Sequence, residues 1–344
     1  MKDLDEIRAS IKKYYASSLQ KTADLKTGAC CCSDGLEPDY REILSHIHPE
    51  ILEKFYGCGS PLPPALEGLT ILDLGCGTGR DVYLASNLVG PQGRVIGIDM
   101  TDSQLEIARR HKEHHRQKFG YSESNVHFHE CLIEDLLSAG IGDESVDLVI
   151  SNCVINLSPD KKSVFSEALR VLRPGGEIYF ADVFADRRVS DEASEDPVVR
   201  GECLGGAMYI EDFRRLLLDL GVRDYRVVSS RPIRLDDPDI LAKTGSIGFM
   251  SATVRAFKLF SLEDRCEDYG QVAYYLGTIP GHPHSFTLDD HHAFYTGRPM
   301  LVCGNTAEML TNTRFGAHFT VSGDRSVHYG LFQCGEPAGN DCGC

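Results

Sequence analysis

Three cysteines lie at positions where loops are expected, and their chemistry gives the first indication of function. Cys58 lies in "FYGCGS", Cys203 lies in "RGECLGGAMY", and Cys153 lies in "LVISNCVIN", where an apolar run expected to form a central strand ends. Thiolates bind soft metal and metalloid ions, which carboxylates bind poorly. Core packing is the competing interpretation, above all for Cys153, because free cysteine is among the most often buried residues.

The segments that must position these thiols alternate short β-rich runs with helical patterns from about residue 69 onward. This alternation is typical of a parallel sheet wrapped by helices. We expect strands at 69–76, 94–100, 125–131, 146–154 and 176–184, helices at 81–89, 103–119 and 161–172, and a turn at 173–176. A helix at 210–221 and strands at 224–230 and 249–260 would complete a Rossmann-like α/β sheet of seven strands.

The chain divides into four regions by composition. Residues 1–66 hold one helical segment, a cysteine cluster, the loop of Cys58 and a Pro-rich linker, and residues 67–260 hold the expected sheet. Residues 261–335 contain many short β-like runs with little helical periodicity, which predicts a small β-rich domain. Residues 336–344 are expected to form a flexible, Cys-rich tail.

Composition excludes several classes of function. Lys and Arg number 35 against 51 Asp and Glu, a formal net charge of −16, so phosphate backbones are repelled and nucleic acid is not an expected partner. No run reaches the roughly 18 apolar residues that span a bilayer, and no signal peptide is visible, so we expect a cytoplasmic protein without membrane contact. In that compartment the 13 cysteines are not a disulfide framework, and their spacing does not favour structural zinc.

A glycine-rich turn, "LDLGCGTGR" at 72–80, is expected to end a strand and open a helix. Asp99 ends the next expected strand, 20 residues after Gly79, where a carboxylate can accept hydrogen bonds from ribose hydroxyls. The spacing G-x-G-x-G after Asp73 differs from the dinucleotide fingerprint and resembles motif I of class I S-adenosylmethionine-dependent methyltransferases. A chance glycine turn in another doubly wound fold is the alternative interpretation.

This resemblance implies S-adenosyl-L-methionine as the cofactor, with adenine contacts after the third strand. The expected cofactor-binding residues are Tyr56, Asp73, Gly75, Cys76, Gly77, Asp99, Met100, Ile133, Glu134 and Asn152. Three of these have an ordinary alternative: Glu134 as a solvated surface charge, Cys76 as a small filler, and Tyr56 as a packing residue.

A closer resemblance rests on five segments. "YGCG", "ILDLGCGTGRD", "VIGIDMT", "ISNCVINL" and "GECLGGA" are similar, in order and spacing, to segments of arsenite S-adenosylmethionine methyltransferases. The resemblance covers roughly residues 40–260, and the β-rich tail matches only loosely. It implies that Cys58, Cys153 and Cys203 hold trivalent arsenic as thiolates, with the arsenic lone pair directed at the sulfonium methyl group and no general base required.

The resemblance also implies that cysteines reduce the methylated arsenic by forming a disulfide. Cys58 would pair with Cys30, Cys31 or Cys32, of which Cys30 is favoured, so the implied catalytic set is Cys30, Cys58, Cys153 and Cys203. Arsenite or its thiol conjugates would be the substrate, thioredoxin or glutathione the reductant, and the enzyme a monomer. The remaining strand-like cysteines, Cys131, Cys266, Cys303 and Cys334, are expected to be inert core residues.

Two other functions remain open from the sequence. A methyltransferase of a small organic substrate, of the quinone or sterol type, would need an acid or base near the donor and no trio of thiols. A thiol-rich protein that sequesters a metalloid would bind tightly without turnover.

Overall fold

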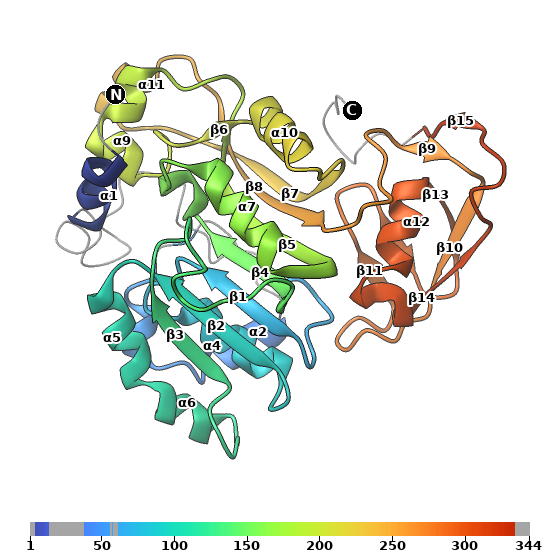
Figure 1. The fold of residues 1–344 in the computed structure, drawn as a ribbon, viewed down its shortest axis with the longest axis horizontal. Coiled ribbons are helices and arrows are strands. Elements are labelled where there is room, and N and C mark those ends of the chain that lie inside the picture. The colour runs from blue at the N-terminus through green and yellow to red at the C-terminus, as the bar shows by residue number, and fades with distance from the viewer. Residues whose placement is uncertain (1–3, 14–37, 56, 58–60, 334–344) are drawn as a thin grey trace.

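The computed structural model of the chain describes residues 4–13, 38–55, 57 and 61–333 (Figure 1). Its centre is a mixed sheet in the strand order β3-β2-β1-β4-β5-β8-β7. The strand bounds are β1 (Thr70–Leu74), β2 (Arg94–Asp99), β3 (Val126–Glu130), β4 (Val146–Asn152), β5 (Leu172–Ala185), β7 (Tyr225–Ile233) and β8 (Phe249–Phe257). A short eighth strand, β6 (Met208–Tyr209), pairs with the end of β5. The predicted seven-stranded Rossmann-like fold is confirmed.

The pairing pattern determines where a ligand can bind. Strands β1 to β5 are mutually parallel, and β8 is inserted antiparallel between β5 and β7. The chain order reverses between β1 and β4, so the carboxyl ends of these two neighbours diverge into loops on opposite faces. Open α/β sheets bind ligands in the crevice at this switch point.

Helices cover both faces of the sheet. α2 (Pro38–Leu44), α3 (Pro49–Leu52), α4 (Arg80–Val89) and α5 (Asp102–Arg110) contribute to one core layer, and α7 (Lys161–Val171) and α10 (Ile210–Asp219) contribute to the other. α7 buries Val164, Phe165, Ala168 and Val171, the spacing expected of an amphipathic helix. The helix predicted at 103–119 is two helices, because the backbone leaves helical geometry at His111 between α5 and α6 (Lys112–Lys118).

The turn predicted at 173–176 is a bulge inside β5. Val146 pairs with Leu172 and Leu148 pairs with Glu177, so the residues between Leu172 and Glu177 leave the register of β4. Gly175 has a φ of +79°, which side-chain-bearing residues rarely adopt. The turn signal was therefore right, and the strand resumes on both sides of it.

A layer of short helices covers the carboxyl ends of β4 and β5. It consists of α1 (Leu4–Lys13), α8 (Asp191–Glu195), α9 (Pro197–Gly201) and α11 (Pro238–Thr244). Figure 1 shows α1 beside α9, at the edge of the molecule opposite the C-terminal region. Ile11 of α1 shares one apolar cluster with Cys153 and Cys203. The first helix of the chain therefore packs close to the expected thiol site.

The C-terminal region contains three small sheets with their own apolar core. Its strands are β9 (Glu267–Asp268), β10 (Gln271–Tyr275), β11 (Ser285–Thr287), β12 (Ala293–Tyr295), β13 (Pro299–Val302), β14 (Phe319–Ser322) and β15 (Gly330–Leu331). The region also contains a helix that was not predicted, α12 (Gly304–Thr311). This helix buries polar Asn305 and Thr306 together with Met309 and Leu310, so its sequence lacks an amphipathic period.

A buried cluster of charges joins this region to the large sheet. Glu177 of β5 is fully buried and accepts a hydrogen bond from Nε of Arg255 at 2.6 Å and another from the guanidinium of Arg314. Arg255 also donates to the carbonyl oxygen of Leu288 at 2.6 Å. The described helices include none with the length and apolar character needed to cross a membrane.

Candidate functional site

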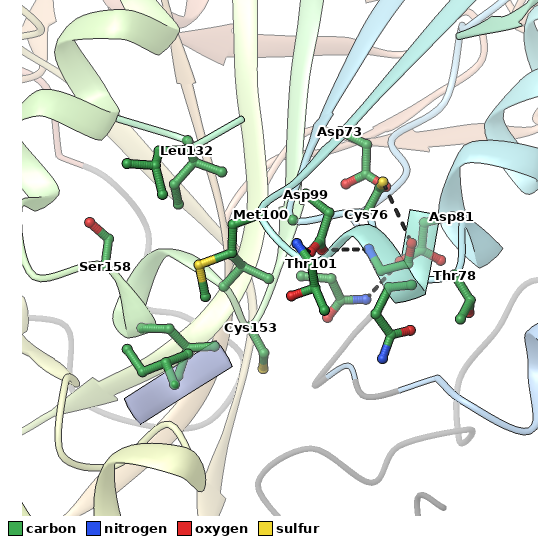
Figure 2. A pocket seen from close by; sticks show the side chains of 18 of the residues that line it. Asp73, Cys76, Thr78, Asp81, Asp99, Met100, Thr101, Leu132, Cys153 and Ser158 are labelled. Atoms are coloured by element: carbon green, nitrogen blue, oxygen red, sulfur yellow. Dashed lines mark hydrogen bonds between the residues drawn. The ribbon is translucent and has the colours of Figure 1, made fainter. Parts of the chain in front are cut away.

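A cavity opens at the carboxyl ends of β1, β2 and β4 and encloses about 1050 Å³, including the part open to solvent (Figure 2). Of the residues expected to bind a cofactor or substrate, it is lined by Asp73, Gly75, Cys76, Gly77, Asp99, Met100, Ile133, Glu134, Asn152 and Cys153. Sequence positions spread over 80 residues are thus brought to one site. Tyr56, Cys58 and the Cys30–Cys32 cluster lie outside the described residues.

The glycine turn requires glycine for two separate reasons. Gly75 and Gly77 have φ values of +73° and +52°. A Cβ on Gly75 would lie 2.3 Å from Cγ1 of Val154, so no side chain fits there. The amide groups of Gly75 and Cys76 both donate to the carbonyl oxygen of Ile98 at 2.8 Å. The turn is therefore fixed against β2 and against the loop that follows β4.

Asp99 ends β2 and directs its carboxylate into the turn. One oxygen accepts a hydrogen bond from the amide of Gly77 at 2.9 Å, and the other accepts one from the amide of Thr101 at 2.8 Å. Burial raises the pKa of Asp99, and these amide hydrogen bonds oppose the rise. Each carboxylate oxygen has a further lone pair, so Asp99 can still accept from a diol at the cavity wall.

Asp73 is a buried acceptor with an unmet hydrogen bond. Its side chain is 2% exposed, and its Oδ2 has no hydrogen-bond partner within the described part of the chain. The pKa of Asp73 is raised well above its usual value, first by burial and then by the nearby carboxylates of Asp81 and Asp99. A ligand with a cationic donor would satisfy this oxygen, and the ammonium group of S-adenosylmethionine has that chemistry.

A second polar group supports the end of β4, and the sequence analysis missed most of it. Asn152 donates from Nδ2 to Asp81 at 3.0 Å, and Nε of Arg80 donates to the same carboxylate at 2.8 Å. The guanidinium carbon of Arg80 lies 3.3 Å from the ring centroid of Phe55. A Cβ on Gly57 would lie 2.6 Å from Nδ2 of Asn152. The only sequence signal for this group is the "RD" pair directly after the glycine turn.

Glu134 lies in the cavity wall, as expected, but its carboxylate already has protein partners. Its Oε1 accepts hydrogen bonds from Oγ of Ser158 at 2.9 Å and from the guanidinium of Arg8 at 3.3 Å. Arg8 and Ile11 of α1 also line the cavity, which the sequence analysis did not predict. The carboxylate of Glu134 therefore ties α1 to the site, so it is not a solvated surface charge.

Cys153 and Cys203 are adjacent, buried, and unusual in backbone conformation. Their φ values are +58° and +63°, in the left-handed region that residues other than glycine seldom adopt. The thiol of Cys203 donates to the carbonyl oxygen of Cys153 at 3.3 Å, and the amide of Cys153 donates to Ala181 at 2.8 Å. Each such conformation costs on the order of 1–3 kcal/mol and persists only where packing enforces it, often at functional sites.

The glycines after Cys203 explain how the two loops meet. A Cβ on Gly206 would lie 1.8 Å from the carbonyl oxygen of Asn156, so the loop of Cys203 fits against the turn after β4 only with glycine there. Asn156 fixes that turn by donating from Nδ2 to Val183 at 2.5 Å and from its amide to Asp182 at 3.0 Å.

The described cysteines differ in redox state. Cys153 is disulfide-bonded, whereas Cys76, Cys131, Cys203, Cys266 and Cys303 are reduced. Burial and the carboxylates of Asp99 and Asp73 raise the pKa of Cys76 well above its usual value. Cys76 is thus a neutral thiol at physiological pH, which agrees with its interpretation as a small filler.

Two family models match the chain. A methyltransferase domain model matches residues 65–221, and an arsenite methyltransferase C-terminal domain model matches residues 268–336.

The chain is similar to known proteins over most of its length. The chain is 50% identical over 327 residues to an arsenite methyltransferase of Aquipseudomonas alcaligenes, which covers 95% of this chain and 94% of the relative. It is 40% identical over 319 residues to the arsenite methyltransferase of Homo sapiens, and the match covers 92% of this chain and 84% of the human protein. The crystal structure of an arsenic(III) S-adenosylmethionine methyltransferase from Chlamydomonas reinhardtii superposes with a TM-score of 0.84 at 51% identity, covering 87% of this chain and 100% of that one.

Proposed function

Since the chain belongs to the arsenite methyltransferase family and methylates arsenite with S-adenosylmethionine, we propose that the thiolates of Cys58, Cys153 and Cys203 hold the trivalent arsenic during transfer. The observation that carries this proposal is the contact between Cys203 and the backbone of Cys153 beside the cavity. Two cysteines, 50 positions apart in sequence, are brought together there in strained conformations. Soft thiolate ligands suit a soft trivalent centre.

The residues around the glycine turn would hold the cofactor. We propose that Asp99 accepts from the ribose hydroxyls, that Asp73 accepts from the ammonium group, and that Met100 and Ile133 pack against the adenine. The unsatisfied oxygen of Asp73 and the position of Asp99 at the cavity wall support this assignment. When bound, S-adenosylmethionine supplies an electrophilic methyl group. The chain's contribution is to hold the arsenic in position, which can supply much of the rate.

No general base is required in this mechanism, because the nucleophile is the arsenic lone pair, which carries no proton. This requirement separates the proposal from a methyltransferase of an organic oxygen or carbon, which would need one. The buried carboxylates nearest the cavity, Asp73 and Asp99, have hydrogen-bonding roles in the cofactor site instead.

We further propose that cysteines reduce the methylated product. Methylation converts trivalent arsenic to pentavalent arsenic; two thiolates then give up two electrons and become one disulfide, and the arsenic returns to the trivalent state. Cys58 and one of Cys30, Cys31 and Cys32 would form this pair, with Cys30 favoured. Cys153 is disulfide-bonded in the structure, so it would bind arsenic only after this disulfide is reduced. A thiol reductant of the thioredoxin or glutathione class would restore the thiols.

The proposal includes a monomeric, cytoplasmic enzyme. Its functional divisions would be the N-terminal segment 1–66, the cofactor-binding domain 67–260, the β-rich domain 261–335 and the tail 336–344.

The decisive experiment combines turnover with cofactor binding. Purified protein is incubated with S-adenosylmethionine, arsenite and a thiol reductant, and the arsenic species are separated. We expect methylated arsenic from the wild type and a loss of about 100-fold or more in Cys203→Ser, because serine is a poor ligand for a soft centre. The affinity of Cys203→Ser for S-adenosylmethionine, measured by calorimetry, is the internal control and should be unchanged. Normal turnover in this variant would contradict the proposal.

A second experiment tests the division of labour among the thiols. Methylarsenite has one valence occupied by carbon, so two sulfurs suffice to hold it, and we propose that these are Cys153 and Cys203. Cys58→Ser should then lose arsenite methylation and retain conversion of methylarsenite. Equal losses on both substrates would contradict this assignment.

A further inference from the structure

Cys266 and Cys303 form a pair of thiols in the C-terminal region that methyl transfer does not use. Their side chains are hydrogen-bonded to each other, and both cysteines are reduced. The sequence analysis predicted inert strand residues here. Cys303 instead follows β13 and caps the N-terminus of α12, where its sulfur accepts a hydrogen bond from the amide of Thr306 at 3.4 Å. Cys303 is fully buried, as predicted for a core cysteine, but it lies at a helix N-terminus and not in a strand.

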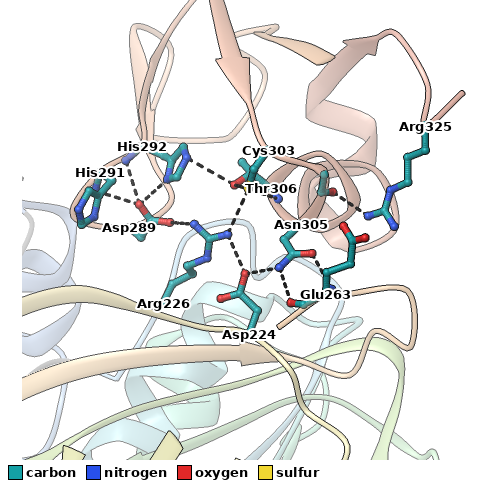
Figure 3. A network of polar contacts seen from close by, with 11 residues as sticks. Asp224, Arg226, Glu263, Asp289, His291, His292, Cys303, Asn305, Thr306 and Arg325 are labelled. Carbon is teal, nitrogen blue, oxygen red and sulfur yellow. Dashed lines mark hydrogen bonds and ion pairs between the residues drawn. The ribbon is translucent and has the colours of Figure 1, made fainter. Parts of the chain in front are cut away.

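Cys303 is held as a neutral thiol, because its hydrogen bond with Cys266 and its burial raise the pKa of the thiol. Nη2 of Arg226 lies 3.7 Å from its sulfur, and the hydroxyl of Thr306 lies 3.3 Å from it (Figure 3). Arg226 belongs to β7 of the large sheet and is 9% exposed, so its charge acts through little solvent. Arg226 and Thr306 oppose this rise in pKa without reversing it.

Further polar residues hold this arrangement in place. Arg226 is bound by the carboxylates of Asp224 at 2.8 Å and Asp289 at 3.3 Å. Asp289 also contacts Nδ1 of His292 at 2.7 Å, and Nε2 of His292 lies 3.4 Å from the hydroxyl of Thr306. Figure 3 shows this continuous path from His292 through Thr306 to Cys303. These contacts fix the position of Cys303 beside Thr306.

Cys266 is the more accessible member of the pair. Cys266 is half-buried and directly precedes β9, whose described ladder is two residue pairs with β15. The amide of Phe332 donates to the carbonyl oxygen of Cys266 at 2.8 Å, and the neighbouring Leu331 is 59% exposed. So short a ladder, with so little apolar burial, opens readily.

This dithiol is distinct from the methyl-transfer cavity. Every residue that lines the cavity precedes position 160, whereas the two cysteines and their contacts lie at position 224 or later. The two sites therefore contribute no side chain to each other.

We propose that Cys266 and Cys303 form a second arsenical site, which binds a trivalent arsenical that carries one organic group and two exchangeable hydroxyls. Two S–H bonds and two As–OH bonds break, two As–S bonds form, and two water molecules leave. The arsenic stays trivalent throughout, so no oxidant or reductant is consumed. The dithiol thus matches the valence of a monosubstituted arsenical, a chemical class to which methylarsenite belongs.

The number of sulfurs selects this ligand over a divalent cation such as zinc. Zinc in structural sites takes four ligands, whereas this pair supplies two. The nearby imidazole of His292 already contacts Asp289 and Thr306.

The test uses the full chain and phenylarsine oxide as the probe. The reduced protein is treated with N-ethylmaleimide with and without the probe, and labelling of Cys266 is followed by peptide mass spectrometry. We expect saturating probe to slow this labelling by about tenfold or more. Cys303→Ser keeps Cys266 and removes its chelating partner, so protection should disappear. Cys131→Ser, which removes a half-buried thiol elsewhere, should leave the protection intact.

A direct measurement accompanies this protection assay and does not depend on a variant that folds. Digestion of probe-treated wild type should release the peptides of Cys266 and Cys303 joined by one phenylarsenic group. Equal labelling of Cys266 with and without probe would overturn the proposal, as would full protection in a folded Cys303→Ser or a disulfide-linked peptide pair in place of the arsenic-bridged one. None of these readouts requires S-adenosylmethionine or turnover, so they are independent of the proposed methyl-transfer mechanism.

Discussion

The thiol of Cys203 donates a hydrogen bond to the carbonyl oxygen of Cys153, at an Sγ–O distance of 3.3 Å, and both residues have left-handed backbone conformations. The contact fixes the loop after α9 against the end of β4. It also means that a change at either position acts on the backbone of the other, so binding and packing must be separated by experiment.

Cys153→Ser separates the two interpretations of this residue. Serine is nearly isosteric with cysteine, so a purely structural role predicts a loss of about 1–3 kcal/mol in the free energy of unfolding, with turnover kept in the folded fraction. We expect instead a folded protein that methylates neither arsenite nor methylarsenite. Circular dichroism and arsenic speciation on the same sample test this expectation. Near-normal turnover in a folded variant would show that Cys153 is a core residue and not an arsenic ligand.

Asp99→Ala tests the cofactor site. The substitution removes the carboxylate that accepts from the amides of Gly77 and Thr101 and faces the cavity. Hydrogen bonds to a charged group contribute about 1.5–3 kcal/mol, so the Kd for S-adenosylmethionine should rise about tenfold or more while arsenite binding is unchanged. Asp102→Ala, which removes an exposed partner of Arg109, is the control and should bind the cofactor normally. An unchanged Kd for S-adenosylmethionine in Asp99→Ala would show that Asp99 does not bind the ribose.

Gly75→Ala measures how closely the glycine turn packs against β4. Gly75 and Gly120 have nearly equal φ values, +73° and +72°, but a Cβ on Gly75 would overlap Val154 and a Cβ on Gly120 would meet open space. Gly120→Ala should therefore lose only the free energy of the left-handed backbone conformation, about 1–2 kcal/mol, and Gly75→Ala about 1–3 kcal/mol more. Urea unfolding of both variants gives the difference. Equal losses in the free energy of unfolding would show that the side chain of Val154 moves aside without strain.

Asp182 gives the stability of the protein a defined pH dependence. Burial raises the pKa of this carboxyl to about 7, although the amides of Val183 and Asn156 donate to it. Its pKa in the unfolded chain is about 3.9, so the folded state holds the extra proton between about pH 4 and 7. The contribution of Asp182 to the free energy of unfolding is therefore greatest at low pH and falls as the pH rises to 7.

Asp182→Asn should remove this contribution, because an amide does not titrate. Relative to the wild type, the variant should lose less stability between pH 5 and pH 7.5 in urea unfolding. Lys161, whose pKa is lowered to about 8 by burial, acts in the opposite direction and only above that window. Parallel stability curves for the two proteins would mean that the carboxyl titrates normally.

The central strands β2 and β4 were predictable because each is a largely apolar run bounded by a turn or a polar residue. β4, for example, buries Leu148, Val149 and Ile150 and then ends at Asn152, so the position of Cys153 at a strand end followed directly. The expected cofactor residues on β1 and β2 also met at one cavity, since parallel strands end at the same edge.

Other parts of the site depend on contacts that leave no local pattern. The ion pair of Arg8 with Glu134 spans 126 residues, so nothing near Arg8 in the sequence indicates its place in the cavity wall. The left-handed conformations of Cys153 and Cys203 are imposed by packing, because local sequence would favour glycine or asparagine there. The pairing of Cys266 with Cys303 likewise depends on the fold of the C-terminal region.

The fully buried Glu177 has a consequence for how the molecule unfolds. One of its guanidinium partners, Arg255, comes from β8, and the other, Arg314, comes from the C-terminal region. If the C-terminal region detached, a carboxylate in the interior of the large sheet would lose one of its two cations, which is strongly unfavourable. The two regions should therefore unfold as one cooperative unit. A chain that ends after β8 would lack Arg314, so its buried Glu177 would keep Arg255 as its one described cationic partner.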